Sequence, residues 1–338
     1  MHWSVADFNG ILTDLKTKIG PQHLTTPRNA DCLVVWQDVL GSFGDLIKSM
    51  KYTGTSKPTF VVQHGRAATS DYDKPNSFPL SSDYFLCWGQ NDKDRMDRLG
   101  YKDQTVITGC PLNAHIKPKV PHREKVILFV PVNTGKEEPE NIAVYYELLK
   151  LRYAKAQVKV LDNKLALKDK WGFDGKLNLP FREISSDFDV VAKLLPWHDK
   201  NLYHGNTLTG TQYSPKNNEL IFELLRNVDL VVGLDTGCTE IFAMAHDVPV
   251  IVVEGFKYRQ YKEDGRAFVE TDIYRSPGAT YCSLDNLATT IDSYFEHPEI
   301  KRKERAAVAE AEMGISYGNA TNNIYNFIRS KVKEIVQA

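Results

Sequence analysis

The stretch that decides the fold is "DLVVGLDTGCTEIFAMAHDVPVIVV", which runs from Asp229 to Val253. Near its two ends, Leu230–Leu234 and Val248–Val253 are short apolar runs with the composition of buried strands. Between them the sequence predicts a helix that begins at Glu240. A strand, a helix and a second strand in this order predict a right-handed crossover in a parallel sheet, and therefore an α/β fold.

The turn between this strand and this helix predicts an anion site. Gly237 allows a tight turn and a close approach of the backbone to a ligand. The first amides of a helix lack partners within the helix, and together with the helix dipole they favour phosphate. Thr236 and Thr239 add hydroxyl donors, and Glu240 can accept hydrogen bonds from a ribose or a sugar. The alternative is an ordinary capped turn, which every α/β protein contains.

The alternation of strands and helices extends over most of the chain. Further strands are expected in "DCLVVWQDVLG", "TFVVQHG", "DYFLCWG", "TVITGCP", "VILFVPVN", "QVKVLD" and "DVVAKLLP". Further helices are expected in "SFGDLIKSM", "QNDKDRMDRLGY", "PENIAVYYELLKLRYAK", "NNELIFELLRNV", "SLDNLATTIDSYFEH" and from Glu299 to Val336. The opening segment is also expected to be helical, because its apolar residues recur at helical spacing. These residues are Val5, Phe8, Ile11, Leu12 and Leu15.

A stretch rich in proline and basic residues, Asn113–Lys125, interrupts this alternation and predicts a linker. We therefore expect an N-terminal domain over residues 1–118, a C-terminal domain over residues 119–315 and a closing helix over residues 316–338. Ligands of such α/β units bind beyond the carboxyl ends of the strands. The expected site is accordingly a cleft between the two domains.

The composition excludes several functional classes. The chain has 338 residues with a net charge of -1, which leaves no large positive field for nucleic acid. No apolar run reaches the length of a membrane span, and the first residues lack the pattern of a signal peptide. The five cysteines are scattered and form no CxxC pair, which predicts free thiols, a cytoplasmic location and no structural zinc.

Several segments, taken in their order along the chain, resemble one group of nucleotide-sugar enzymes. "DTGCTE" followed by "AMAHDVPVIVV" resembles the donor-binding turn of enzymes with the GT-B fold. The likeness is greatest to bacterial UDP-N-acetylglucosamine 2-epimerases and to capsule and teichoic-acid transferases, which include the CDP-glycerol glycerophosphotransferases. "VVQHG", "SSDYFLCWGQNDKDRMDRLGY" with "VITGCP", "DVVAKLLPWHD" and "YGNATNNIYNFI" are similar to further segments of that branch. The resemblance covers the chain from Thr59 to the C-terminus.

The resemblance implies a GT-B-like fold, with two Rossmann-type domains and an interdomain cleft. It implies that the donor binds at Asp235, Thr236, Gly237, Cys238, Thr239 and Glu240. Two positions depart from the family pattern. The epimerase turn has two adjacent glycines where this chain has Gly237 and Cys238, and the histidine expected before a proline stands after it, at His198.

The resemblance also assigns residues to the acceptor side. His64 matches a histidine that lies near the acceptor in these transferases and can act as general base, because imidazole titrates near working pH. Gly65 allows the chain to turn there, and Arg66 can hold a phosphate or a carboxylate. The alternative is that His64 only fixes a loop.

Other strand ends supply further candidates for the donor site. Lys193 and His198 can meet the donor phosphates or the base, although they can equally be surface residues. Thr134 and Gly135 follow the first strand of the C-terminal domain, where the loop of GT-B enzymes often faces donor phosphates, although a plain turn fits as well.

Several other patterns carry less weight. Asp187-Phe188-Asp189 matches a metal-binding DxD pattern but precedes a strand, so we expect neither a metal nor a cofactor. Cys238 has no neighbouring histidine in the sequence that would act as base for a nucleophile. The basic run Lys301–Lys303 with Arg305 is typical of a solvated helix face, or of peripheral contact with the inner face of a membrane.

The function expected from the sequence is transfer from a nucleotide-activated sugar or polyol phosphate to a glycan or lipid-linked acceptor, in surface polysaccharide assembly. The first alternative is a UDP-sugar 2-epimerase, which needs no second substrate. The second alternative is a scaffold that binds nucleotide sugars without catalysis. Replacement of His64 distinguishes the scaffold from the enzymes, because a scaffold does not need a base and has no turnover to lose.

Overall fold

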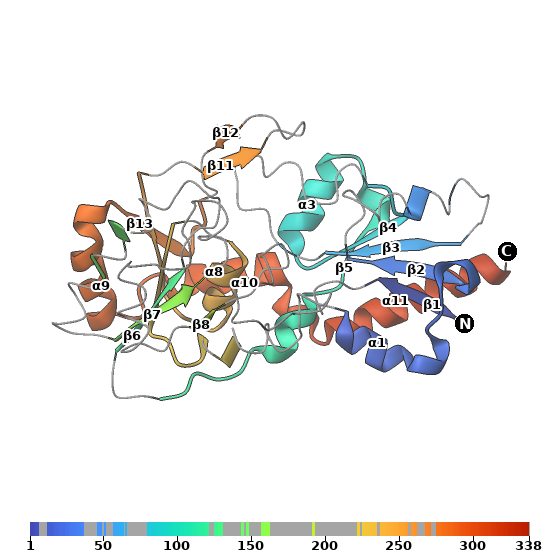
Figure 1. Ribbon diagram of the computed structural model, residues 1–338, viewed down its shortest axis with the longest axis horizontal. Coiled ribbons are helices and arrows are strands. Elements are labelled where there is room, and N and C mark those ends of the chain that lie inside the picture. The colour runs from blue at the N-terminus through green and yellow to red at the C-terminus, as the bar shows by residue number, and fades with distance from the viewer. Residues whose placement is uncertain are drawn as a thin grey trace, which may run out of the picture. The chain divides into compact units, whose positions relative to one another are not determined.

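Two parallel sheets organise the chain, one in each of two units (Figure 1). The computed structural model describes residues 1–6, 12–36, 46–48, 51, 57–63, 65, 80–121, 125–130, 143–144, 147–148, 157–162, 191–192, 222–223, 225–234, 237–255, 258–261, 268–271 and 275–337. The first unit is formed by described residues within 1–115 and 309–337, and the second by described residues within 116–308. The first unit is therefore discontinuous in sequence.

The first unit contains a five-stranded sheet in the order β1-β2-β3-β4-β5, and all its strands pair in parallel. The strands are β1 (Trp3–Ala6), β2 (Cys32–Val35), β3 (Thr59–Val62), β4 (Tyr84–Cys87) and β5 (Thr105–Ile107). Its helices are α1 (Thr13–Ile19), α3 (Gln90–Arg98) and α11 (Ala320–Gln337), with short 3-10 turns at Pro21–His23, Pro27–Asn29, Lys102–Gln104, Pro111–His115 and Ile315–Tyr317.

The opening segment is a strand, so the helix expected there is wrong over Trp3–Ala6. Trp3 pairs with Cys32 on one side and forms a bridge with Leu24 on the other. These partners supply the backbone hydrogen bonds that outweigh a short helical spacing of apolar residues. The helix begins only at Thr13, and residues 7–11 lie outside the described part of the chain.

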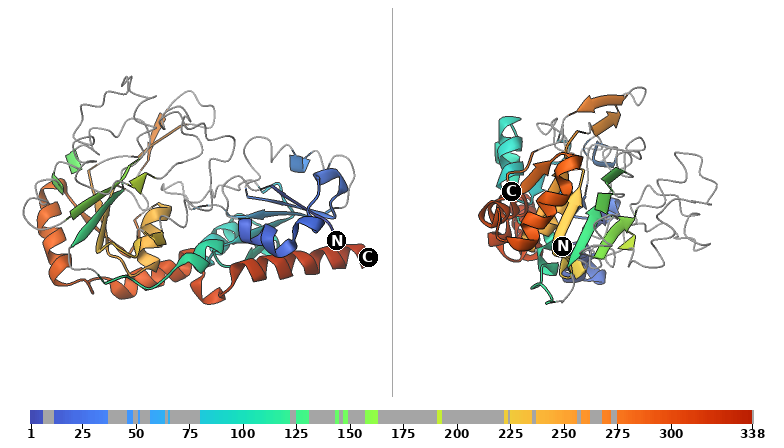
Figure 2. Two further views of the ribbon diagram at one scale, coloured as in Figure 1. Left: turned by 60° about the horizontal axis from the view of Figure 1, so that its bottom comes forward. Right: turned by 90° about the vertical axis from the view of Figure 1, so that its left-hand side faces the viewer.

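Both faces of the first sheet are covered. Side chains on one face, including Val61 and Phe85, pack with Met96 of α3. On the other face Phe60 stacks on Tyr84 with 5.3 Å between ring centroids, and Phe327 of α11 meets both rings edge on. The long α11 follows this face in Figure 2. Such aromatic contacts explain why a helix far away in the sequence completes this unit.

The second unit contains a six-stranded parallel sheet in the order β13-β10-β9-β6-β7-β8. The strands are β6 (Val126–Val130), β7 (Gln157–Asp162), β8 (Val191–Ala192), β9 (Leu230–Gly233), β10 (Val250–Val253) and β13 (Ala279–Cys282). Strands β7 and β8 extend to one side of β6, and β9, β10 and β13 are added on its other side. This is the Rossmann strand order. All the strands are parallel, but the direction in which successive strands are added along the sheet reverses between β6 and β9.

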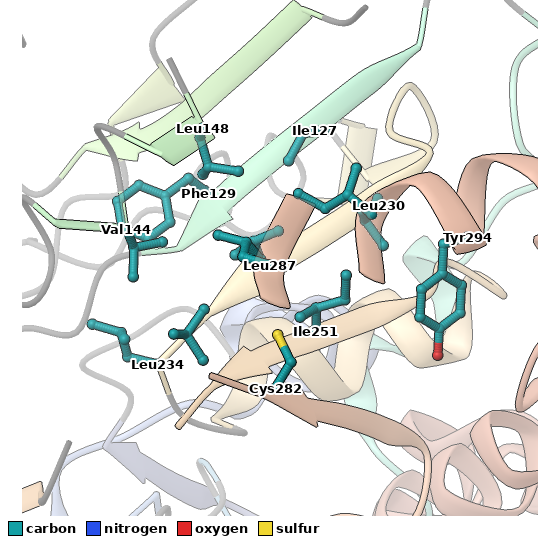
Figure 3. Close-up of a cluster of buried hydrophobic side chains, with 13 residues drawn as sticks. Ile127, Phe129, Val144, Leu148, Leu230, Leu234, Ile251, Cys282, Leu287 and Tyr294 are labelled. Atoms are coloured by element: carbon teal, nitrogen blue, oxygen red, sulfur yellow. The ribbon is translucent and has the colours of Figure 1, made fainter. Parts of the chain in front are cut away.

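The core of the second unit lies between this sheet and its helices (Figure 3). Ile127 and Phe129 of β6 and Leu230 of β9 are fully buried with Leu287, the first residue of α9 (Leu287–Glu296). Val144 and Leu148 join the same cluster and stand four residues apart. Residues 143–144 and 147–148 are helical, as the sequence predicts for this segment.

Two strands of the second unit form a separate antiparallel hairpin that the sequence did not indicate. They are β11 (Tyr258–Tyr261) and β12 (Phe268–Thr271). Strand β13 was also not expected, because "ATYC" is short and has a threonine and a tyrosine at its centre. A 3-10 turn at Leu284–Asn286 connects β13 to α9.

The expected linker is attached to the second unit rather than free. The Arg226 guanidinium donates to the Pro118 carbonyl at 3.0 Å, and the Val120 amide donates to the Arg226 carbonyl at 2.9 Å. Lys119 forms an ion pair with Asp229 at 2.8 Å. Residues 118–120 are therefore held against the turn that precedes β9.

Helix α10 (Arg302–Met313) begins in the second unit and ends in the first. The basic run at its start mostly serves internal contacts. Arg305 is 0% exposed and binds the Asp247 carboxylate at 2.7 Å, and Arg302 binds the same carboxylate at 2.8 Å. Lys301 donates to the Ala279 carbonyl at 2.6 Å. Among the described helices, none combines the length and the apolar composition that crossing a membrane would require.

At the other end of α10, Gly89 marks the point where β4 meets the helix. A Cβ at Gly89 would overlap the Ala311 carbonyl, so glycine is required for this close approach. Asn91 donates to the Glu312 carboxylate at 2.9 Å, and the Cys110 amide donates to the Met313 carbonyl at 2.8 Å. These contacts fix the last turn of α10 within the first unit.

Helix α8 (Cys238–Ala245) ends on a buried histidine. His246 is packed against Phe222 and Phe242, and its Nδ1 lies 2.8 Å from the Phe242 carbonyl oxygen. Burial lowers the pKa of His246 below its ordinary value of 6.5; the hydrogen bond opposes the shift, and the nearby Arg226 adds to it. The folded state therefore favours the neutral ring.

The buried Arg305 side chain of α10 leads to a stability prediction. Arg305→Ala removes a guanidinium that binds Asp247 and the carbonyls of Pro298 and Ile300. We expect it to lower the free energy of unfolding by about 2–4 kcal/mol, through lost hydrogen bonds and a cavity. Arg302→Ala is the control, because its 58% exposed side chain binds the same carboxylate and should cost less than about 1 kcal/mol. Urea denaturation measures both, and equal losses would contradict the assignment.

His246 leads to a pH prediction. Its pKa is lower in the folded than in the unfolded state, so its stabilising contribution is complete above about pH 6.5. That contribution is lost as the pH falls through the folded pKa, because the unfolded state then binds more protons. We expect His246→Gln to flatten the decline in unfolding free energy below pH 6.5. His297→Gln, at an exposed histidine, controls for the loss of an imidazole; an unchanged slope in His246→Gln would refute the prediction.

Candidate functional site

The candidate site lies at the carboxyl edge of the second sheet, where the strand order reverses. Strands β6 and β9 are neighbours there, although they are separated by β7 and β8 in the sequence. The connections that leave two such strands diverge to opposite faces of the sheet and leave a crevice between them. The turn that joins β9 to α8 therefore stands at the position where α/β sheets bind ligands.

The helix after this turn begins earlier than the sequence suggested. Helix α8 starts at Cys238 instead of Glu240, and Gly237 is its N-cap residue. The first intrahelical bond runs from the Ile241 amide to the Gly237 carbonyl at 3.2 Å. Glu240 thus belongs to the first turn, where an acidic residue is favoured by the helix dipole.

The four described residues of the expected donor turn differ in exposure. Gly237 and Cys238 are partly exposed, whereas Thr239 and Glu240 are 6% and 1% exposed. The backbone of Gly237 has φ -73° and ψ -162°, which other residues also adopt, so this conformation does not itself require glycine. The surface that the described part of this turn offers to a ligand is therefore mainly backbone together with the Cys238 side chain.

The remaining thiols are poor nucleophiles. Cys32, Cys87, Cys110 and Cys282 are buried, and only Cys238 is partly exposed. Burial raises the pKa of Cys87 and of Cys282, and it raises the pKa of Cys32 to about 12. These three groups remain protonated at neutral pH. Among the described residues, no group of three or more His, Cys, Asp or Glu side chains is placed to hold a metal ion.

A polar cluster that the sequence did not single out stands at the end of the neighbouring strand β10. Glu254 follows β10 directly, and its carboxylate forms an ion pair with Arg275. The Arg275 guanidinium also lies over the Tyr281 ring, 4.8 Å from its centroid. Gly255, with φ 105°, then redirects the chain toward the β11–β12 hairpin. A charged residue directly after "VPVIVV" was the only signal available in the sequence.

In the first unit, Gln63 forms a network of hydrogen bonds next to the expected acceptor residues in the sequence. Gln63 is buried at the carboxyl end of β3, and its side-chain amide donates to the Gly65 carbonyl at 3.1 Å and to Asp92 at 2.6 Å. Its side-chain oxygen accepts from the Trp88 amide at 2.8 Å, and its backbone carbonyl accepts from the Trp88 indole at 2.8 Å. Asp92 is in turn paired with buried Arg95.

These hydrogen bonds explain why the buried strand β3 is followed directly by the polar residue Gln63. The amide of Gln63 has two donors and one acceptor oxygen, and all three functions are used by the ends of β3, β4 and α3. Gly65 is half-buried beside it. A hydrogen bond therefore joins Gln63 and Gly65, the two described residues that flank the expected base in the sequence.

Many of the expected site residues lie outside the described part of the chain. They are His64, Arg66, Thr134, Gly135, Lys193, His198, Asp235 and Thr236. The DxD pattern at residues 187–189 lies outside it as well. The structure places Gly237, Cys238, Thr239 and Glu240 after β9, where the order of strand addition reverses. It places Gly65 just after the end of β3.

Comparisons with known proteins extend this picture. Neither a family model nor a curated protein sequence matches the chain. Solved structures match over nearly its full length. The UDP co-structure of S. aureus MnaA has a TM-score of 0.54 at 13% identity, covering 95% of this chain and 78% of that one. A putative UDP-N-acetylglucosamine 2-epimerase from Listeria monocytogenes has a TM-score of 0.55 at 14% identity, covering 96% and 79%. The wall teichoic acid polymerase TagF has a TM-score of 0.51 at 13% identity, covering 98% and 89%.

These similarities confirm the expected fold and the proteins it was expected to resemble. At identities of 12–14% they concern the architecture and not the activity. The described sheets agree with the expected fold. Each unit has a parallel sheet with helices packed on that sheet, and the sheet of the second unit has the Rossmann strand order. The chain has the GT-B fold of the epimerases and of TagF.

Proposed function

We propose that this protein is a transferase that moves a group from a nucleotide-activated sugar or polyol phosphate to the hydroxyl of a glycan or lipid-linked acceptor. The observation that carries the proposal is the position of the β9–α8 turn at the reversal point of the second sheet. A phosphate at the N-terminus of α8 would gain from the amides and dipole of that helix. Transfer of a sugar breaks its bond to the phosphate, and transfer of a polyol phosphate breaks the phosphoanhydride bond to the nucleotide. In both cases negative charge grows on the departing phosphate, and the same groups stabilise it.

In this proposal the donor side consists of Asp235–Glu240, with Thr134, Gly135, Lys193 and His198 as further ligands. The partly exposed Gly237 and Cys238 would approach the phosphates through their backbone. Buried Glu240 would orient the first turn of α8 or accept a hydrogen bond from the donor. The co-structure of MnaA with UDP supports a nucleotide as the ligand of this fold.

The acceptor side in this proposal centres on His64. As general base, its imidazole would take the proton of the acceptor hydroxyl while the oxygen attacks the donor. Arg66 would bind an anionic group of the acceptor. The hydrogen bonds of Gln63 to Gly65 and Trp88 support this role, because they fix the residue that precedes His64 in the sequence.

A UDP-sugar 2-epimerase is the second candidate. It is favoured by the similarity to the Listeria putative epimerase, whose TM-score of 0.55 is slightly above the 0.51 of TagF. The two activities differ in one experimental requirement. An epimerase converts UDP-N-acetylglucosamine without any second substrate, so incubation with that sugar nucleotide alone and analysis of the products by NMR would reveal it.

The first prediction of the proposed function concerns nucleotide binding. We expect one family among UDP, CDP, CMP, GDP and their sugar conjugates to raise the melting temperature. At a concentration of one hundred times Kd the stabilisation is about 2.7 kcal/mol, which corresponds to several degrees. The double variant Thr236→Ala, Glu240→Gln should lose the shift, whereas Arg302→Ala, outside the site, should retain it. The absence of a shift with every nucleotide would refute both the transferase and the epimerase.

The role of Gln63 is the second prediction. Gln63→Leu keeps the side-chain volume but loses the bonds to Asp92, Gly65 and Trp88, so we expect turnover to fall while nucleotide affinity stays unchanged. His64→Ala should lower turnover by about 10²–10⁴. If Gln63 acts through His64, the double variant should be little worse than His64→Ala alone. Additive effects would show that Gln63 acts elsewhere, and unchanged turnover in His64→Ala would favour the scaffold.

A further inference from the structure

The cluster of Glu254, Arg275 and Tyr281 stands beside the candidate donor turn. In the pairing of β9 with β10, Val252 is opposite Gly233. Strand β10 ends at Val253 and is followed by Glu254, whereas β9 ends at Gly233, four residues before Gly237, the N-cap of α8. Neighbouring strands lie about 4.8 Å apart. Glu254 and the Arg275 that it binds are therefore at the same carboxyl edge as the N-terminus of α8.

The Arg275 side chain is held in a defined place. Its guanidinium lies over the Tyr281 ring, and the Tyr281 hydroxyl accepts a hydrogen bond from the Ser276 amide at 2.6 Å. Tyr281 itself belongs to β13, which pairs with β10. The ring is thus fixed by the sheet at one end and by Ser276 at the other. A guanidinium stacked on such a ring keeps its plane and its donors oriented.

The partner of Arg275 can be replaced by another anion. The Arg275 side chain is 68% exposed and the Glu254 side chain 36% exposed, so their ion pair is open to solvent. Exposed ion pairs contribute little to stability. A phosphate offers the guanidinium two oxygens in the same geometry as a carboxylate and carries more charge. Exchanging Glu254 for a phosphate therefore costs little.

We propose that Arg275 binds a phosphate of the donor nucleotide, and that Glu254 holds the guanidinium in place until the phosphate replaces it. This inference rests on the proposed function and names a ligand for the same site. The N-terminus of α8 follows β9, and Arg275 is bound to Glu254, which follows the neighbouring strand β10. Two positive groups so placed suit two adjacent phosphates. The preferred ligand is accordingly a nucleoside diphosphate or its conjugate, with the second phosphate bound by Arg275.

The proposal makes opposite predictions for its two charged residues. Arg275→Gln removes a charged donor, so the Kd of UDP or CDP should rise roughly tenfold or more. The Kd of UMP or CMP should change less, because the α8 end remains. Glu254→Gln removes a competing negative charge, so the diphosphates should bind severalfold more tightly. Isothermal titration calorimetry measures each Kd at one fixed salt concentration.

Two further variants control the experiment. Arg302→Gln alters another exposed arginine that binds a carboxylate, and it should leave every Kd unchanged. Arg275→Lys keeps the charge but loses the paired donors, so it should fall between wild type and Arg275→Gln. If Arg275→Gln does not fold, Arg275→Lys and Glu254→Gln still test the proposal through their opposite effects on Kd.

The outcomes separate this inference from the proposed function. If wild type binds diphosphates and the variants at 254 and 275 bind them equally well, the role of Arg275 is refuted and the proposed function stands. If wild type binds no nucleotide, the proposed function falls, and inorganic pyrophosphate then decides the role of Arg275. Pyrophosphate binding that is lost in Arg275→Gln would support an anion site at this residue, and no pyrophosphate binding would refute it.

Discussion

The pairing of β9 with β6 is the constraint on which the second unit depends. Val126–Val130 first receives β7 on one side, and much later in the sequence it receives β9 on the other. Parallel strands joined by right-handed crossovers must place their helices on opposite faces when the direction of addition reverses. In sheets of this order the carboxyl ends of the two strands at the reversal mark the expected position of a ligand. The site at the start of α8 and the core around Ile127 and Leu230 both follow from this one pairing.

The sequence predicts the parts of the fold in which local pattern and tertiary packing agree. Strands such as Leu230–Gly233 and Val250–Val253 are apolar throughout, because both of their faces are buried. It fails for Trp3–Ala6, where neighbouring strands select an extended backbone in a segment of helical spacing. It also misses β13, because Thr280 and Tyr281 are only half-buried and read as polar. Tertiary contacts decide these segments, and no short window of sequence contains them.

The candidate site divides in a similar way. The position of the β9–α8 turn could be predicted, because a buried strand followed by a small-residue turn is visible in the sequence. The burial of Glu240 could not, since it depends on where the helix begins. The cluster around Arg275 could not be predicted either. Glu254 and Arg275 are separated in the sequence by β11 and β12, and only the folded chain brings them together. Gln63 was read only as the end of a strand, although its amide connects three elements.

The discontinuity of the first unit has a consequence for the order in which the protein is made. Strands β1–β5 are synthesised before the second unit, but their aromatic face is covered by α11, which is synthesised after it. The entire second unit, from residue 116 to residue 308, emerges in between. Folding during synthesis should therefore complete the second unit before the first, with Phe60 and Tyr84 exposed in the meantime.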